Sequence, residues 1–200
     1  MISIGQHKLL CGDLTHGAIR TLMGDERADV VYVDPPWGPG MLQAFATMNV
    51  RGSAPHLSWP DFLRAFCDAV VEARAPRAPV FVEMGWKWAP DLDRAMADVG
   101  LLRRRCWPIA YGPKSAPWWN ALTLYGPDDV ALEMPDPPHG EAVTRAVLAA
   151  VVRPGMVVLD PCTGLGMTAR VTHKLGGAFR GVELNSGRLE RAAAWLRKHS

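Results

Sequence analysis

The stretch Val157-Val-Leu-Asp-Pro-Cys-Thr-Gly-Leu-Gly166 runs an apolar segment into an acid and then into a pair of glycines. It predicts a buried strand, a tight turn and the start of a helix, because glycine lets a ligand approach the backbone and a helix N-terminus offers unpaired N–H donors. Simple turn chemistry would also explain two glycines. The dinucleotide-binding fingerprint needs a third glycine, which is missing here, and this disfavours nicotinamide and flavin cofactors. The next predicted strand ends in Glu183, about twenty residues later, where an acid can bind a ribose diol.

Strand and helix signals alternate along the rest of the chain, which predicts an α/β protein with a mainly parallel sheet and helices on both faces. We expect seven strands, at residues 7–13, 28–36, 78–85, 103–112, 120–126, 155–160 and 178–184. The connection between the strands at 103–112 and 120–126 is so short that these two are expected to pair antiparallel. Because no internal repeat or low-complexity linker is present, residues 1–200 are expected to form one domain.

Helix signals lie between the predicted strands. Ser58 is the expected N-cap of one helix, with Pro60 in its first turn and Asp61 three residues after the cap. Further helices are expected at residues 15–24, 90–100, 140–152, 166–176 and 186–199. Residues 38–57 are rich in Gly and Pro and are expected to form a loop. A shorter loop, residues 112–120, is expected to carry Trp118 and Trp119.

The composition is that of an ordinary globular protein, with 48% hydrophobic and 21% charged residues in a chain of 200. No apolar run approaches the roughly 20 residues that cross a bilayer, and the N-terminus lacks the layout of a secretory signal, so we expect a cytoplasmic protein without a membrane partner. The four cysteines form no Cys-x-x-Cys pair, and neither a metal site nor a disulfide is expected. The net charge of +2 is weak evidence about partners. An excess of Arg over Lys suits phosphate binding, but a GC-rich genome would also produce it.

A second stretch, Val30-Val-Tyr-Val-Asp-Pro-Pro-Trp37, ends an apolar run in a carboxylate, two prolines and a tryptophan. Prolines remove backbone donors and tryptophan favours burial, so a plain turn is a poor explanation and a held ligand is a better one. The alternative is a strand-ending turn with Trp37 packed in the core. Another Asp-Pro-Pro, residues 136–138, follows no apolar run and precedes no aromatic residue, and we interpret it as a rigid loop.

Taken together, Asp34-Pro35-Pro36-Trp37 and the motif at residues 160–167 resemble those of the S-adenosylmethionine-dependent amino-methyltransferases that modify adenine N6 or cytosine N4 in DNA. The resemblance covers nearly the whole chain. The first motif precedes the glycine motif, which is similar to the permuted arrangement of this family. It implies a Rossmann-like seven-stranded methyltransferase sheet of order 3-2-1-4-5-7-6, circularly permuted, with strand 7 antiparallel.

The resemblance also implies S-adenosyl-L-methionine as cofactor, bound by Asp13, Asp160, Cys162, Thr163, Gly164, Gly166, Glu183 and His139. Asp13 would lie near the adenine amine of the cofactor, although an acid after Gly12 is also a common helix N-cap. His139 stands where the family often has Lys, and an exposed loop histidine is the alternative. Cys162 replaces the usual Phe and Leu165 a frequent Ser, changes that bear on affinity.

The catalytic residues implied are Asp34, Pro35, Pro36 and Trp37. The carboxylate of Asp34 and the carbonyl of Pro35 would accept the two N–H bonds of an exocyclic amine and direct its lone pair toward the methyl donor. Pro36 offers no competing N–H and stiffens the loop. Trp37 would stack on the base, a contact of roughly 1–3 kcal/mol, and a base in a duplex would be flipped out. Asp in the first position favours adenine N6 in DNA.

Several alternatives stay open at this point. The chain could be a catalytically silent partner that binds nucleic acid, or a methyltransferase of RNA, cytosine N4 or a protein amide. None of its expected loops is long enough for the target-recognition insert of many family members. Specificity could come from residues 38–57, from the loop with Trp118 and Trp119, from dimerisation or from a separate subunit. Four tryptophans in expected loops could stack on bases, pack in the core or form an interface: Trp86, Trp88, Trp118 and Trp119. A restriction-modification role is equally open.

Overall fold

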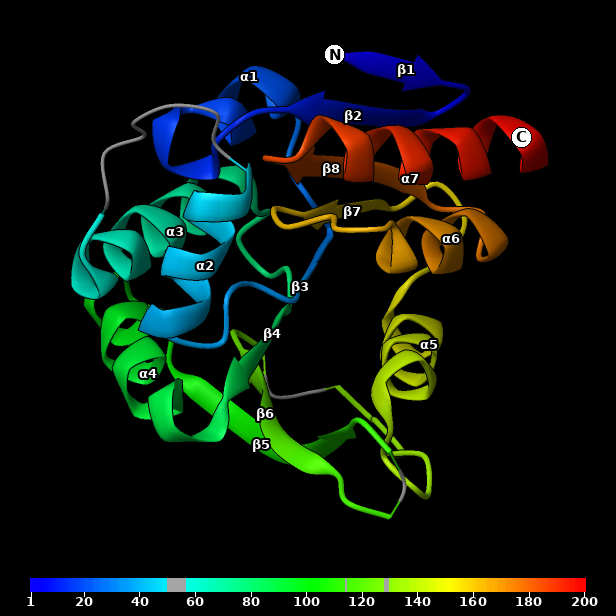
Figure 1. The fold of residues 1–200 in the computed structure, drawn as a ribbon. Helices are drawn as coiled ribbons and strands as arrows, with labels where there is room; N and C mark the ends of the chain where they lie inside the picture. The colour runs from blue at the N-terminus through cyan, green and yellow to red at the C-terminus, as the bar shows by residue number, and fades with distance from the viewer. Residues whose placement is uncertain (50–56, 114, 128–129) are drawn as a thin grey trace.

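A single β-sheet forms the centre of the protein (Figure 1). The computed structural model describes residues 1–49, 57–113, 115–127 and 130–200. Within these residues the sheet has eight strands in the order β1-β2-β8-β7-β3-β4-β6-β5. The strands are β1 (Ile2–Ile4), β2 (His7–Cys11), β3 (Val30–Val33), β4 (Val80–Gly85), β5 (Arg103–Tyr111), β6 (Trp118–Tyr125), β7 (Val157–Asp160) and β8 (Ala178–Glu183).

The order of the seven predicted strands is confirmed. Strands β2, β8, β7, β3 and β4 pair in parallel, and β6 pairs antiparallel with both β4 and β5. The prediction of seven strands missed one: β1 pairs antiparallel with β2 at the sheet edge. Three residues are too few to show a strand period in the sequence, and only the turn at Gly5, with φ of +51°, signals the hairpin.

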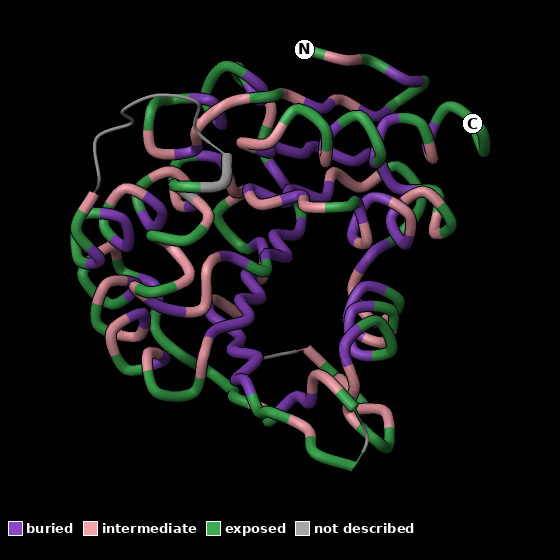
Figure 2. The backbone as a smooth tube through the Cα atoms, viewed as in Figure 1, coloured by how far each residue is buried: buried purple, intermediate pink, exposed green. Residues whose placement is uncertain are grey.

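Helices cover both faces of the sheet, as predicted (Figures 1 and 2). One face packs against α1 (Ala18–Met23), α3 (Trp59–Ala73) and α4 (Ala89–Asp98), and the other against α5 (Gly140–Val151), α6 (Met167–Lys174) and α7 (Ser186–His199). Alternate residues of β3 enter different cores, with Val31 on the first face and Tyr32 on the second. Burial on both sides explains why this strand reads as a continuous apolar run. No helix of the described residues is long and apolar enough to span a bilayer.

The prediction of a loop at residues 38–57 is wrong for its first part, which is helix α2 (Pro39–Asn49). Pro39 reads as a breaker in the sequence, yet it takes the first helical position, where its fixed φ suits the helix and no N–H is missed. Most of the residues that follow have high helix propensity. Residues 50–56 lie outside the described part of the chain.

The predicted loop at residues 112–120 is also shorter than expected, because Trp118 and Trp119 already belong to β6 and pair with Tyr111 and Ala110 of β5. Ser58 is confirmed as an N-cap, since its hydroxyl accepts from the backbone N–H of Asp61 at 3.3 Å. Two 3-10 turns, η1 (Leu14–His16) and η2 (Trp86–Trp88), complete the described elements.

Candidate active site

The carboxyl ends of five parallel strands meet at one edge of the sheet, and an acid lies at or near each end. Within the described residues these acids are Asp13 after β2, Glu183 of β8, Asp160 of β7, Asp34 after β3 and Glu83 of β4. All five line one cavity of about 780 Å³. The cavity lies at the point where the strand order reverses direction, between β7 and β3, which is where open α/β sheets place ligands.

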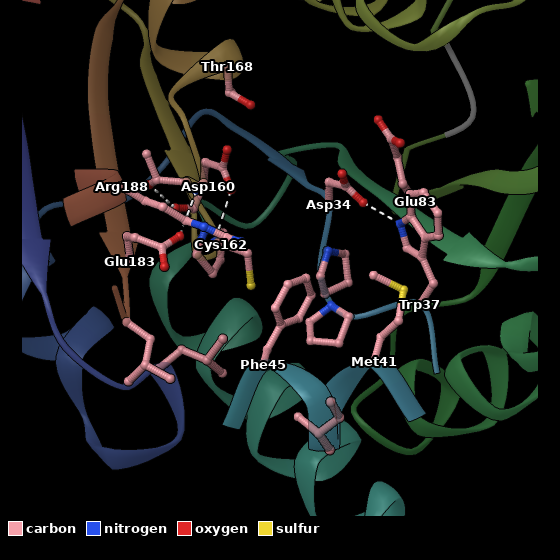
Figure 3. Close-up of a pocket in the computed structure, with 18 of the residues that line it drawn as sticks. Asp34, Trp37, Met41, Phe45, Glu83, Asp160, Cys162, Thr168, Glu183 and Arg188 are labelled. Carbon is pink, nitrogen blue, oxygen red and sulfur yellow. Dashed lines mark hydrogen bonds between the residues drawn. The ribbon is translucent and has the colours of Figure 1, made fainter. Parts of the chain in front are cut away.

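The Asp34-Pro35-Pro36-Trp37 segment forms one wall of the cavity (Figure 3). The indole N–H of Trp37 donates to Oδ1 of Asp34 at 2.5 Å. The ring of Trp37 packs on that of Tyr111, with centroids 4.9 Å apart and planes at 46°. Oδ2 of Asp34 remains available, and an ionised carboxylate accepts at both oxygens. The simple alternative of a Trp37 buried in the core does not hold, because Trp37 lines the cavity.

Two glycines let this segment pass close to β4 and η2. A Cβ atom on Gly85 would lie 2.5 Å from the carbonyl oxygen of Trp37, and one on Gly38 would lie 2.4 Å from the indole ring of Trp88. Contacts this short do not occur, so only glycine fits at either position without a shift of the loop or of the ring. The path of the Asp34 loop is therefore fixed by its neighbours as well as by its prolines.

Electrostatics around Asp34 differ from those of a surface acid. Although the cavity gives solvent access to this side chain, surrounding protein raises the pKa of Asp34 to about 6, and the bond from Trp37 opposes the rise. Glu83, which is only 1% exposed, has a pKa well above its usual range because of burial first and the nearby Asp34 second. Sequence reasoning missed Glu83, and the signal was an acid inside the apolar run Val80-Phe-Val-Glu-Met84.

The glycine motif forms the opposite wall. Oδ1 of Asp160 accepts from the backbone N–H of Cys162 at 3.0 Å, and burial raises the pKa of Asp160 to about 7. The two oxygens of Glu183 accept from the N–H groups of Gly164 and Asn185, each at 2.8 Å. Gly164 has a φ of +54°, a conformation that glycine adopts without strain.

The two glycines of this motif have different surroundings. Gly164 lines the cavity, as do Cys162 and Thr163. Gly166 packs against α7 instead: its φ is +83°, and a Cβ there would lie 2.7 Å from the Cβ of Ala192. The structure thus places Gly166 behind the cavity wall, where it allows the close approach of α6 and α7.

Asp13 and His139 have local partners. Oδ1 of Asp13 accepts from the N–H of Thr15 at 2.8 Å and caps η1, as the simpler interpretation expected, while the residue also lines the cavity. Nε2 of His139 contacts the carbonyl oxygen of Gly112 at 3.0 Å. At that helix start, Gly140 and Glu141 reach the cavity lining, whereas His139 faces the β5 end.

Helix α2 covers the cavity from a side that the sequence did not predict (Figure 3). Met41 and Phe45 of α2 line the cavity, together with Arg188 of α7. The guanidinium of Arg188 lies 5.2 Å from the centroid of the Phe45 ring, a cation–π contact between α7 and α2. Because residues 38–57 were expected to form a loop, the sequence did not predict that Met41 and Phe45 share a helix face toward the cavity.

Three of the four tryptophans noted in the sequence are exposed by about half of their surface: Trp86 (55%), Trp118 (52%) and Trp119 (50%). They lie at the same edge of the sheet as the cavity, since Trp118 pairs with Tyr111. Trp88 is half-buried and packs against Trp59. A base-stacking role and an interface role both fit the three exposed rings.

The glycine wall suits a nucleoside-like, positively charged ligand. Its carboxylates can accept hydrogen bonds from hydroxyl and amino groups. The cavity volume of about 780 Å³ is within the usual range for small-molecule sites, roughly 300–1,000 Å³. Apolar surface from Leu165, Leu184 and Phe45 can cover a ring system. These residues fit S-adenosyl-L-methionine.

Comparison with solved structures shows which fold this is. The chain matches M1.HpyAVI with a TM-score of 0.69 at 14% identity, over 94% of this chain and 98% of the other. It matches TTHA0409 from Thermus thermophilus, a candidate DNA modification methylase solved with S-adenosyl-L-methionine, with a TM-score of 0.68 at 14% identity, over 96% and 93%. The cytosine-N4-specific PvuII DNA methyltransferase matches with a TM-score of 0.72 at 12% identity, over 98% and 87%. No protein-family model matches the chain. The predicted methyltransferase fold is confirmed.

Proposed function

We propose that this protein is an S-adenosyl-L-methionine-dependent N-methyltransferase that methylates an exocyclic amine of a DNA base, with adenine N6 as the target. The observation that supports it best is that one cavity joins Asp34 to Gly164, so an acceptor for the amine and a cofactor loop share a single space. The solved structures of the same fold include DNA methyltransferases, and two of them hold S-adenosyl-L-methionine.

The cofactor site would be formed by the residues predicted for it that line the cavity: Asp13, Asp160, Cys162, Thr163, Gly164 and Glu183. Glu183 accepts from Gly164 in this structure, and it has further lone pairs for a ribose diol. S-adenosyl-L-methionine supplies an electrophilic methyl group on a positively charged sulfur. Gly166 contributes by holding α6 against α7, and His139 by fixing the start of α5 through Gly112.

Asp34 and Pro35 would activate the amine. The lone pair of an exocyclic amine is delocalised into its ring, which makes the amine a poor nucleophile. Oδ2 of Asp34 and the carbonyl oxygen of Pro35 can accept its two N–H bonds and so pull the lone pair out of conjugation. Held in this way, the amine meets the methyl group without the loss of entropy that a free encounter requires.

The choice of adenine N6 rests on the Asp at position 34 rather than on the fold. A cytosine-N4-specific enzyme shares the fold with a TM-score of 0.72, so the architecture accommodates either base. The rings of Trp37 and Tyr111 would form the wall on which the base rests. Because a carboxylate in the wall of a cavity cannot reach an amine inside a duplex, we expect the base to leave the helix before it reacts.

The test is to identify the methylated product. Deuterium-labelled S-adenosyl-L-methionine is incubated with the protein and pools of DNA, RNA or protein, and the digested products are analysed by mass spectrometry. Labelled N6-methyladenine in DNA is the expected result. Label on cytosine N4 would change the assigned base, and label only in RNA or protein would overturn the proposal. Nucleic-acid binding without any label would identify a silent partner.

Two matched variants make the test specific. Asp34→Ala is expected to abolish transfer and to leave cofactor binding near that of the unmodified protein in calorimetry. Asp136→Ala removes the acid of the second Asp-Pro-Pro, and Asp136 is not among the residues that line the cavity. It should keep the full activity, and equal loss in both variants would contradict the role of Asp34.

A further inference from the structure

Four side chains, one of them that of Asp34, form a closed set of neighbours at the end of β3. Asp34 accepts from Trp37 at 2.5 Å, Trp37 packs on Tyr111, and the hydroxyl of Tyr111 donates to Oε2 of Glu83. Glu83 lies next to Asp34, because Val33 pairs with Val82 and the two acids are the next residues of these parallel strands. This set thus links three strands, β3, β4 and β5.

Glu83 has two tyrosine partners, one for each of its oxygens. Tyr32 contacts Oε1 at 2.5 Å, and the same hydroxyl lies 3.2 Å from Oγ1 of Thr144 in α5. The titratable groups that face Glu83 are Asp34 and Tyr32 from β3, Tyr111 from β5 and Asp160 from β7, and none is a cation. The two tyrosine hydrogen bonds favour an ionised Glu83, but burial and the adjacent Asp34 oppose it more strongly, since no cation among these neighbours balances the charge.

The hydroxyls of Tyr32 and Tyr111 can each donate to one oxygen of an ionised Glu83. If Glu83 is neutral, its proton on Oε1 is donated to the oxygen of Tyr32 instead, and Tyr32 donates to Oγ1 of Thr144. The hydrogen bonds are satisfied in either state, so the neighbouring charges decide between them. Two adjacent carboxylates tend to share one proton, as like charges cannot both ionise easily. The more buried of the two is Glu83, so the proton belongs there.

We propose that Glu83 is a positioning residue that acts in its protonated form: it holds Tyr111, through Tyr111 it holds Trp37 against Asp34, and it leaves a single negative charge beside the target base. The expected effect of Glu83 on methyl transfer rests on the proposed function. In this proposal the buried Glu83 helps to place Asp34 and to keep Asp34 ionised. Tyr111 connects the two acids through Trp37.

The kinetic test compares Glu83→Gln, Glu83→Ala and Tyr111→Phe. Glutamine resembles a protonated carboxyl, with an N–H₂ group for Tyr32 and an oxygen for Tyr111, so Glu83→Gln should lose only a small part of kcat near neutral pH. Glu83→Ala frees Tyr111 and should lower kcat by roughly 100-fold, the loss that a misplacement of about 1 Å causes. Tyr111→Phe keeps the ring and should fall between the two. A Glu83→Gln variant as inactive as Glu83→Ala would overturn the proposal.

The pH profile separates positioning from a general loss of structure. The unmodified protein should lose kcat at alkaline pH, as Glu83 ionises beside Asp34, and Glu83→Gln should lack this limb because its side chain does not titrate. Identical alkaline limbs in the two proteins would overturn the assignment. Burial and Asp34 raise the pKa of Glu83 to about 8, which gives the pH at which the profiles should part.

A stability measurement tests the protonated state without any substrate. A group whose pKa is raised on folding stabilises the fold fully below its unfolded pKa, and this contribution is lost as pH rises through the folded pKa. The Tm of Glu83→Gln should therefore increase relative to that of the unmodified protein between about pH 5 and about pH 8. A Tm difference that does not vary with pH would overturn the neutral Glu83 even if DNA is not the substrate.

Discussion

Gly85 ends β4 beneath the Asp34 loop, and its replacement by alanine tests how closely this loop must be placed. The new Cβ would lie 2.5 Å from the carbonyl oxygen of Trp37, about 1 Å closer than carbon and oxygen normally approach. Backbone cannot rotate away as a side chain can, so the loop itself must shift. A shift of about 1 Å costs roughly 100-fold in rate, which corresponds to about 2.7 kcal/mol in activation free energy.

The same substitution should lower stability, because overpacking typically costs about 1–3 kcal/mol. For a chain of this size that is a fall in Tm of roughly 2–4 °C per kcal/mol. Gly40→Ala is the matched control, since a Cβ at Gly40 meets no atom within 4 Å. The assay is kcat on DNA at saturating cofactor, with cofactor Kd from calorimetry. We expect Gly85→Ala to lose kcat and keep Kd, and a kcat equal to that of Gly40→Ala would refute the argument.

Three further results are expected. In the proposed mechanism the amine needs an ionised Asp34, whose pKa is raised to about 6, so kcat/KM should fall as pH drops through 6; a profile flat to about pH 5 would contradict this. Burial raises the pKa of Asp160 to about 7, so ionisation of this acid destabilises the fold as pH rises. Asp160→Asn should therefore increase the Tm more at about pH 8 than at about pH 5. The same variant should bind the cofactor more weakly in calorimetry. Gly166→Ala would place a Cβ 2.7 Å from that of Ala192 at a φ of +83° and should lower the free energy of unfolding in urea by roughly 1–3 kcal/mol; an unaltered urea midpoint would exclude the packing role.

Much of the site could be predicted because the C-terminal ends of parallel strands lie at one edge of the sheet, so acids at those ends lie close together. Asp34 and Asp160 each end an apolar run and Glu183 ends a predicted strand, and the strand order implied by the motifs brings those ends together. Local sequence is enough for such residues. The role of Asp13 as both a cap and a lining residue follows from the same position at a strand end.

Glu83 and Phe45 could not be assigned in this way. Glu83 is surrounded by apolar residues in sequence, and only the register of β3 with β4 and the hydroxyls of two distant tyrosines give it a role. Phe45 lies in a helix whose first residue is a proline, and proline and glycine read as loop signals. Gly166 has the sequence context of a ligand contact, but its neighbour is Ala192, 26 positions later in the chain. Tertiary contacts decide all three.

The charge of the cavity explains which ligands it can admit. Besides Glu83, which we propose is neutral, its lining contains five acids, Asp13, Asp34, Glu141, Asp160 and Glu183, against two cations, Arg170 and Arg188. Both guanidinium groups have other partners, the carbonyl oxygen of Leu165 and the ring of Phe45. An acidic cavity of this kind attracts a cation and accepts a neutral base, but it repels phosphate.

The same charge bears on the type of cofactor and on how DNA can approach. A dinucleotide would bring its pyrophosphate into this acidic cavity, and the third glycine of the dinucleotide fingerprint is missing as well. S-adenosyl-L-methionine carries a positive sulfur and no phosphate, and so avoids this repulsion. If DNA is the substrate, as we propose, its backbone must stay outside the cavity for the same reason. Only an unpaired base could then reach Asp34, so the electrostatics would require base flipping.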